Sequence, residues 1–263
     1  MKDKEKIREY IKQNYTEVAR QGSAGSCCSP GSGCCGGGTL IDIKDLALNL
    51  GYTPSDFEGV PIESNMGLGC GNPIAIAALK EGETVLDLGS GGGFDCFLAA
   101  KEVGASGLVI GVDMTPEMIR QARQNADKGD FKNVEFRLGE IEHLPVADNS
   151  VDAIVSNCVI NLALDKQQVF HEMHRVLKPG GRISVSDIMA TAEIPEEVKT
   201  DLKSITGCIA GAEQMDNVRA MLQKAGFAEI SINPRPGSDE MIASWAPGKE
   251  KFVASFLIEA QKP

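Results

Sequence analysis

A run of short apolar segments that alternate with amphipathic ones limits this chain to few folds. Strands that alternate with helices form a mostly parallel sheet with helices on both faces. The predicted strands cover residues 84–88, 108–112, 134–138, 151–156 and 182–186, and the predicted helices cover 94–103, 115–126 and 166–177. We therefore expect a doubly wound α/β core over residues 81–190.

The segments on either side of this core have a different character. Residues 1–20 predict a charged helix, residues 22–38 form a Gly-, Ser- and Cys-rich tract, and the remainder up to residue 80 predicts a partly helical cap. After residue 190 we expect helices at 195–204 and 213–225 and strands at 227–232 and 251–260, the last strand antiparallel. The predicted organisation is thus an N-terminal cap (1–80), a core (81–190) and a capping insertion with the final strands (191–263).

Charge and composition exclude several functions. The formal net charge is −11 and no run of Lys or Arg occurs, which argues against a nucleic-acid partner. No stretch of 18 apolar residues predicts a membrane span, and the charged N-terminus does not resemble a signal peptide. We expect a cytoplasmic protein, in which the eight cysteines serve as ligands or nucleophiles rather than as disulfide partners.

A Gly-rich turn follows the first predicted strand. Gly89 and Gly91 lie where this strand leads into a helix, so the backbone can approach a ligand at the carboxyl edge of the sheet. The dinucleotide fingerprint needs a further glycine where Phe94 stands, and no Gly-Lys-Ser/Thr sequence follows. The turn therefore predicts a cofactor site that is neither a dinucleotide fingerprint nor a phosphate-binding P-loop.

Asp113 closes the second predicted strand, where a carboxylate can accept hydrogen bonds from both hydroxyls of a ribose. Met114 could pack on an adenine, although a methionine at a strand end also fits an ordinary core. The loop at 139–145 follows the third strand and could border the adenine. Together with the turn at 178–181, these motifs resemble the S-adenosylmethionine site of class I methyltransferases. The resemblance implies a cofactor site made of Asp87, Gly89, Ser90, Gly91, Asp113, Met114, Glu140, Ile141 and Asn157.

Three cysteines lie in loops around this predicted site. Cys158 stands after the fourth strand, where base-methylating relatives carry Asn/Asp-Pro-Pro-Tyr/Phe, and Cys70 and Cys208 each have a glycine beside them. Three thiolates that converge would select a thiophilic centre. An isolated cysteine is more often a small buried hydrophobe, and we assign Cys96, within an apolar helix, to the core.

The segments at 69–73, 87–96, 111–115 and 156–166, with the loop around Cys208, resemble arsenite methyltransferases over residues 64–212. The resemblance implies that Cys70, Cys158 and Cys208 hold As(III) as the substrate. The lone pair of arsenic would take a methyl group from S-adenosylmethionine, giving mono- and dimethylated arsenicals as a detoxification. Such a nucleophile loses no proton, so no general base is needed. Glutathione-like thiols or thioredoxin would act as reductant.

Two vicinal pairs, Cys27-Cys28 and Cys34-Cys35, lie in the Gly-rich tract. They could capture arsenite, but a zinc site, a redox pair or no catalytic role also fits. Two other functions stay open for the whole chain. One is a methyltransferase for a quinone or another small organic molecule, which should tolerate Cys158→Ser. The other is a non-catalytic, thiol-rich metalloid-binding protein, which would not bind S-adenosylmethionine.

Overall fold

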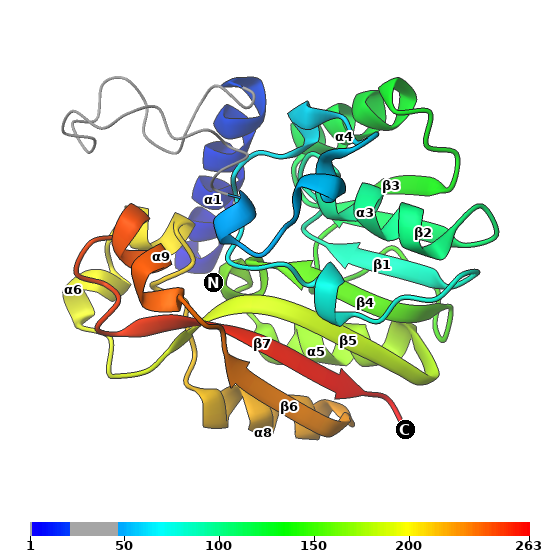
Figure 1. Cartoon of the computed structure of the whole chain (residues 1–263). Coiled ribbons are helices and arrows are strands. Elements are labelled where there is room, and N and C mark those ends of the chain that lie inside the picture. The colour runs from blue at the N-terminus through cyan, green and yellow to red at the C-terminus, as the bar shows by residue number, and fades with distance from the viewer. Residues whose placement is uncertain (1, 22–46) are drawn as a thin grey trace.

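A computed structural model describes residues 2–21 and 47–263. Its centre is a seven-stranded sheet in the order β3-β2-β1-β4-β5-β7-β6, which confirms the expected doubly wound α/β fold (Figure 1). The strands are β1 (Thr84–Leu88), β2 (Leu108–Asp113), β3 (Val134–Leu138), β4 (Val151–Asn157), β5 (Leu177–Ala190), β6 (Ala228–Pro234) and β7 (Val253–Gln261).

The first five strands run parallel, with β1 between β2 and β4. Val85, Leu86 and Leu88 of β1 have no exposed surface, because helices cover both faces of the central strands. β7 is antiparallel to β5, as expected, and β6 pairs with its other side. The carboxyl ends of the parallel strands therefore meet at one edge of the sheet, which is the usual ligand-binding edge of such a fold.

Two layers of helices enclose the sheet. One apolar cluster includes side chains of α3 (Phe94–Val103), α4 (Pro116–Lys128) and α9 (Ser238–Trp245). The other cluster includes side chains of α5 (Lys166–Val176) and α8 (Met215–Ala225). α1 (Lys2–Gln21) packs against α4, and Tyr15 donates a hydrogen bond of 3.1 Å to the carbonyl of Thr206. α1 thus lies near the carboxyl ends of the parallel strands (Figure 1).

Several elements differ from the sequence prediction. The strand expected at 182–186 extends from Leu177 to Ala190, because Leu177 pairs with β4 before the turn and the pairing with β7 continues to Ala190. A register shift opposite Val151–Ala153 accommodates the turn at 178–181. The prediction also missed α9, a short helix that follows Gly237 in a left-handed conformation.

The single helix expected at 195–204 is two short helices, α6 (Glu196–Lys199) and α7 (Leu202–Thr206). Asp201 separates them, because its carboxylate accepts hydrogen bonds from the backbone N–H and the hydroxyl of Ser204 at 2.9 Å and 2.7 Å. A short 3-10 helix, η4 (Ile74–Ile76), lies in the segment that the sequence predicts as a partly helical cap. Two further 3-10 helices precede it, η2 (Pro54–Phe57) and η3 (Ile62–Ser64), and another, η5 (Ile160–Leu162), follows β4.

None of the helices in residues 2–21 and 47–263 combines the length and the apolar character that crossing a membrane requires.

Candidate functional site

The Gly-rich turn after β1 is built to bring backbone close to a ligand. Gly91 has a φ of 49°, and a Cβ atom added there would have no atom within 4 Å, so this peptide borders open space. At Gly92 an added Cβ would lie 2.8 Å from the carbonyl oxygen of Ser64, so only glycine allows this close packing. The loop therefore forms a cradle with one open side.

Asp113, at the end of β2, fixes this cradle from the neighbouring strand. Its carboxylate accepts hydrogen bonds from the backbone N–H groups of Gly91 (3.1 Å) and Thr115 (2.8 Å). Burial raises the pKa of the Asp113 carboxyl, and these two hydrogen bonds oppose the shift. Each carboxylate oxygen keeps a lone pair, so Asp113 can still accept hydroxyl groups of a ribose.

Met114 and Glu140 border a cavity of about 240 Å³ under α1. The helix contributes Glu5, Arg8, Glu9 and Lys12 to its wall. Arg8 pairs with Glu140 and Glu142, each at 3.5 Å, across this cavity. Ile141 is buried beside them. Of the residues that the sequence assigned to an adenine site, Met114 and Glu140 thus line one cavity, and α1 forms its outer wall.

Acidic side chains gather under the N-terminus of α3. Asp87 is buried and accepts a hydrogen bond of 3.1 Å from the Cys96 thiol, so Cys96 is a core residue as predicted. Burial, followed by the charge of Asp95, raises the pKa of Asp87. Burial also raises the pKa of Asp95 to about 6, against hydrogen bonds from Tyr52 and Asn157. The cluster gives this end of the site a negative potential when ionised, which suits a cationic ligand.

Asn157, at the end of β4, joins the N-terminus of α3 to the loop of Cys70. Its Nδ2 atom donates to the carbonyl of Gly71 (2.8 Å), the hydroxyl of Tyr52 (3.1 Å) and the carboxylate of Asp95 (3.2 Å). Its Oδ1 atom accepts the backbone N–H of Cys70 at 3.0 Å. Both ends of the amide are thus engaged by the protein, so Asn157 positions the Cys70 loop.

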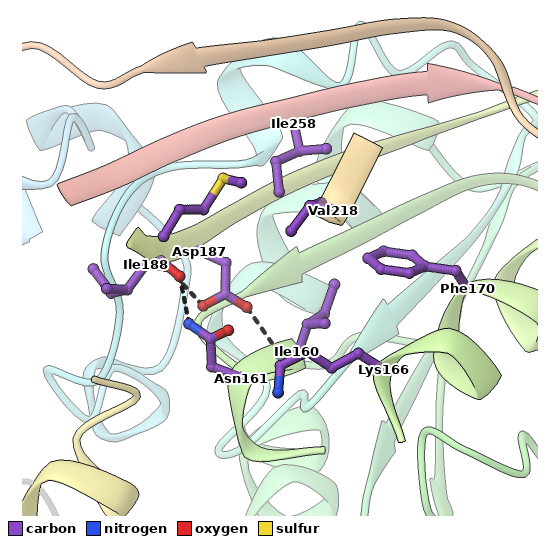
Figure 2. A pocket seen from close by; sticks show the side chains of 9 residues that line it. Ile160, Asn161, Lys166, Phe170, Asp187, Ile188, Val218 and Ile258 are labelled. Atoms are coloured by element: carbon purple, nitrogen blue, oxygen red, sulfur yellow. Dashed lines mark hydrogen bonds between the residues drawn. The ribbon is translucent and has the colours of Figure 1, made fainter. Parts of the chain in front are cut away.

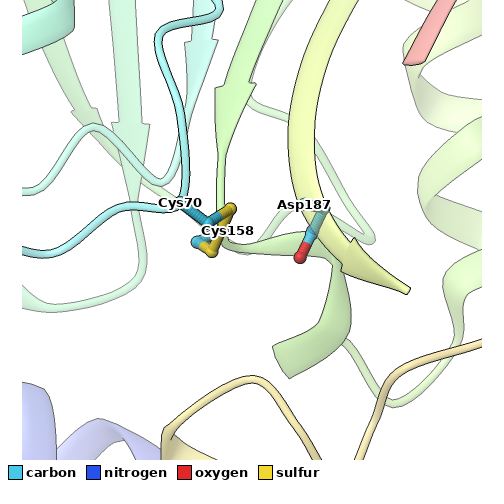
Figure 3. A group of neighbouring side chains, drawn as sticks. All are labelled: Cys70, Cys158 and Asp187. Carbon is cyan, nitrogen blue, oxygen red and sulfur yellow. A yellow bond between two sulfur atoms is a disulfide. The ribbon is translucent and has the colours of Figure 1, made fainter. Parts of the chain in front are cut away.

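Cys70 and Cys158 are joined by a disulfide (Figure 3). Their Cα atoms lie 5.9 Å apart although 88 positions separate them in the sequence. The expectation that the cysteines would not be disulfide partners is therefore wrong for this pair. The fold brings the two loops to the same edge of the sheet, and two thiols at this separation can bond.

Asp187 of β5 lies beside this pair. One carboxylate oxygen and the two sulfur atoms all lie within 4.8 Å of one another. Asp187 accepts hydrogen bonds from the backbone N–H groups of Ile160 (2.9 Å) and Ile188 (2.8 Å), as Figure 2 shows. Burial raises its pKa to about 6. The carboxylate thus fixes the start of η5, directly after Cys158.

Cys208 reaches the same place from the loop after α7. Its thiol donates to the carbonyl of Cys158 at 3.0 Å, and its side chain is buried. Both cysteines have a positive φ, 56° at Cys158 and 61° at Cys208. Non-glycine residues adopt this conformation rarely, and such strain is concentrated at functional sites. The structure therefore places the Cys208 thiol against the backbone of Cys158, which is bonded to Cys70, although Cys208 is not in the group of ligand atoms within 4.8 Å that contains the other two sulfur atoms.

Asn161 holds the loop of Cys208 against the sheet. Its Nδ2 atom donates to the carbonyls of Ile188 and Cys208, the latter at 3.1 Å. An added Cβ at Gly211 would collide with the carbonyl oxygen of Asn161. Lys166 lines a water-sized cavity of about 10 Å³ with Asn161 and Asp187 (Figure 2). Burial lowers the pKa of Lys166, opposed by the charges of Glu213, Asp187 and Cys208.

Sequence reasoning missed Tyr52, Asn161, Lys166 and Asp187 as parts of this site. Asp187 could have been found, because it continues a predicted strand at the ligand-binding edge of the sheet. Tyr52 and Asn161 act through contacts with residues far along the chain, which no local pattern reveals. The predicted capture residues Cys27, Cys28, Cys34 and Cys35 lie outside the described residues.

Comparison with known proteins gives a consistent result. Residues 79–226 match a family described as Methyltransferase domain. The arsenite methyltransferase of Halobacterium salinarum is 50% identical over an alignment that covers all of this chain and 68% of that protein. The arsenite methyltransferase of Aquipseudomonas alcaligenes is 42% identical over 66% of this chain and 51% of that protein. The chain thus spans about two thirds and about half of these two relatives.

A solved structure is similar in fold and in sequence. It is an arsenic (III) S-adenosylmethionine methyltransferase from Chlamydomonas reinhardtii, with a TM-score of 0.63 and 32% identity. The similarity covers 83% of this chain and 73% of that one.

Proposed function

This chain belongs to the arsenite methyltransferase family, and we propose that it transfers a methyl group from S-adenosylmethionine to As(III) held by the thiolates of Cys70, Cys158 and Cys208. The observation that carries the proposal is the convergence of these three cysteines beside the Gly-rich loop. Each comes from a different loop, and the thiol of Cys208 contacts the residue that bonds to Cys70.

The thiol chemistry of the site suits arsenic. Soft thiolate ligands select thiophilic centres such as As(III). The disulfide between Cys70 and Cys158 must be reduced before either sulfur can bind, so a reductant precedes substrate binding. We assign this step to glutathione-like thiols or thioredoxin in a cytoplasmic setting. The loops of Cys70 and Cys158 need little movement, because their bonded sulfur atoms are already neighbours, and the Cys208 loop has to bring the third sulfur to them.

The residues around the Gly-rich loop fit S-adenosylmethionine. Asp113 would accept the ribose hydroxyls, Met114 and Glu140 would border the adenine in the cavity under α1, and Ile141 would border it from the same loop as Glu140. Asp87 supports the acidic N-terminus of α3, which favours a cationic ligand. When bound, the cofactor supplies an electrophilic methyl group on a sulfonium.

The chain's own contribution to the reaction is positioning. Arsenic bound by three thiolates keeps a lone pair, so no side chain has to remove a proton from the nucleophile. Holding the two reactants in line and away from water is a large source of rate acceleration. Asn157 and Asn161 fix the loops that carry the sulfur atoms, and they therefore set this geometry. The products would be S-adenosylhomocysteine and mono- and dimethylated arsenicals, with the thiol reductant returning the formally oxidised arsenic to As(III) between transfers, and we infer a role in detoxification.

The test is methyl transfer from labelled S-adenosylmethionine to arsenite in excess thiol. We expect methylated arsenic from the parent and its loss in Cys158→Ser, with cofactor binding retained. Cys96→Ser is the matched control, because the hydroxyl can keep the hydrogen bond to Asp87 in a cysteine position remote from arsenic.

Two results would count against the proposal. A parent that binds the cofactor but leaves arsenite unmethylated would favour a small organic acceptor. A parent that binds arsenite but not the cofactor would favour a sequestering protein.

A further inference from the structure

Three buried polar atoms without partners lie in segments that pack together around the Gly-rich loop. Among the described residues, three such side-chain atoms are Nδ2 of Asn65, Oγ of Ser90 and Oε1 of Gln121, and a fourth, in Glu250, lies elsewhere in the sequence. Buried donors and acceptors are nearly always satisfied in native proteins, so a cluster of unsatisfied ones indicates that a ligand completes them.

These three residues belong to segments that pack together. The carbonyl of Ser64 abuts Gly92, as the 2.8 Å approach of an added Cβ shows. Gln121 of α4 donates to the carbonyl of Glu63 at 3.3 Å, and Asn125 of the same helix donates to the carbonyl of Gly92 at 2.9 Å. The end of η3, the Gly-rich loop and α4 therefore meet at this point.

The side chain of Asn65 is held in one orientation. Its Oδ1 atom accepts the backbone N–H of Gly67 at 3.0 Å, and a backbone N–H can only face the oxygen of the amide. The Nδ2 atom therefore points away as a pure donor. Asn65 is 7% exposed and Ser90 is 7% exposed, so both unsatisfied groups lie inside the protein.

The strand order indicates which part of the cofactor lies here. Asp113 and the cavity under α1 follow β2 and β3, whereas Cys158 and Asp187 lie on the other side of β1, at β4 and β5. If adenosine binds on the β2 and β3 side and the reacting methyl lies on the β4 and β5 side, the sulfonium lies over the end of β1, which is between them. The amino-acid end branches from that sulfonium, next to Ser90 and Asn65.

We propose that Nδ2 of Asn65, together with Oγ of Ser90, binds the carboxylate of the amino-acid end of S-adenosylmethionine. The inference rests on the proposed use of this cofactor. A carboxylate accepts hydrogen bonds only, and these two atoms can both donate. Gln121 is excluded as a carboxylate ligand because its unsatisfied atom is an acceptor. Asn65 thus becomes a cofactor-binding residue contributed by the loop that leads to Cys70.

The test compares ligands with and without the amino-acid end in calorimetric titrations of the full chain. S-adenosylmethionine and S-adenosylhomocysteine carry the carboxylate, and 5′-methylthioadenosine does not. Asn65→Asp keeps an oxygen for the Gly67 N–H but replaces the donor with a negative acceptor. We expect it to weaken binding of the first two ligands roughly 10- to 100-fold and to leave 5′-methylthioadenosine unchanged.

Ser90→Ala should also weaken binding of the two ligands that carry the carboxylate. The loss of affinity should be smaller, because this change removes one donor and adds no negative charge. Asn72→Asp is the matched control. Its Oδ1 accepts the N–H of Ala75 at 3.1 Å as Asn65 does for Gly67, but its Nδ2 already donates to the carbonyl of Gly51 at 3.3 Å. This variant should leave the ratio of the affinities for S-adenosylmethionine and 5′-methylthioadenosine as in the parent.

The inference is overturned if Asn65→Asp has the parent's ratio of the affinities for S-adenosylmethionine and 5′-methylthioadenosine. This holds whether both affinities are unchanged or both fall by the same factor, since an equal fall would indicate a structural role. A parent that binds none of the three ligands refutes the cofactor assignment as well. If Asn65→Asp changes the ratio as expected but the parent fails to methylate arsenite, the proposed acceptor is refuted and the carboxylate site is retained.

Discussion

Asp187 carries a carboxyl group into the interior beside two sulfur atoms. Its pKa is raised to about 6, mainly by burial, although three backbone hydrogen bonds and the charge of Lys166 lower it. The charged form is therefore less favourable in the folded protein than in the unfolded chain. Since the folded pKa is above the unfolded one, this group's contribution to stability is present at low pH and is lost as the pH rises through about 6.

This linkage predicts a specific pH effect for Asp187→Asn. The Tm of the parent minus the Tm of the variant should decrease as the pH rises from about 4 to above 6. The reason is that only the parent has to ionise a buried carboxyl. Thermal unfolding followed by circular dichroism at several pH values measures this difference. A difference that grows with pH would show that the Asp187 carboxylate is stabilised in the fold.

At the scale of elements, the site depends on loops held together by side-chain amides. Asn161 ties the Cys208 loop to β5, and Gly211 packs directly on the Asn161 carbonyl. In the part of the chain that the structure describes, neither Asn161 nor Gly211 forms a hydrogen bond with the Gly-rich loop. Changes at these positions should therefore affect the arsenic side of the site and leave the cofactor side intact.

Gly211→Ala tests this separation. The added methyl collides with the Asn161 carbonyl, and overpacking of about 1–3 kcal/mol should displace the Cys208 loop and weaken arsenite binding roughly tenfold. Arsenite titration gives the first affinity and calorimetry with S-adenosylmethionine gives the second, which should not change. Gly180→Ala serves as control: its φ of 78° strains the turn at 178–181 without any collision, so it should change neither affinity. Equal losses of both affinities would refute the separation.

α1 is a second element with a separable effect. Arg8 reaches from it to Glu140 and Glu142 across the cavity assigned to the adenine. Half-exposed ion pairs contribute little, so we expect Arg8→Ala to raise the Kd for S-adenosylmethionine only roughly two- to fivefold. Added salt should raise the parent's Kd for S-adenosylmethionine by a similar factor, and it should raise the variant's Kd by less. A variant as salt-sensitive as the parent would exclude this role for Arg8.

The sequence predicted the elements of the core because each is a local pattern. The apolar runs of β1, β2 and β4 and the periodicity of α3 and α5 all correspond to observed elements. The break at Asp201 depends on a side-chain cap, and the length of β5 depends on its pairing with β7, so neither could be deduced locally. The cysteines of the site were indicated first by their places in loops around the predicted cofactor site and then by resemblance, whereas the contacts of Asn157 with Tyr52 and Gly71 join residues 105 and 86 positions apart.

At the scale of the whole molecule, the two halves of the site differ in their dependence on redox state. The Cys70–Cys158 disulfide occupies the sulfur atoms that would bind arsenic, and it does not involve the Gly-rich loop. The oxidised protein should therefore bind S-adenosylmethionine with the affinity of the reduced protein but should not bind arsenite. Calorimetry on both redox forms measures this. Tight arsenite binding by the oxidised form would mean that other groups hold the substrate.

Arsenic X-ray absorption spectroscopy tests the trithiolate site most directly. The protein is reduced with a phosphine, so that no added thiol competes, and loaded with less than one equivalent of arsenite. We predict three sulfur neighbours per arsenic in the parent, and fewer, with oxygen in their place, in each of Cys70→Ser, Cys158→Ser and Cys208→Ser. Three sulfur neighbours retained in all of these variants would contradict the account, because other cysteines would then be the ligands.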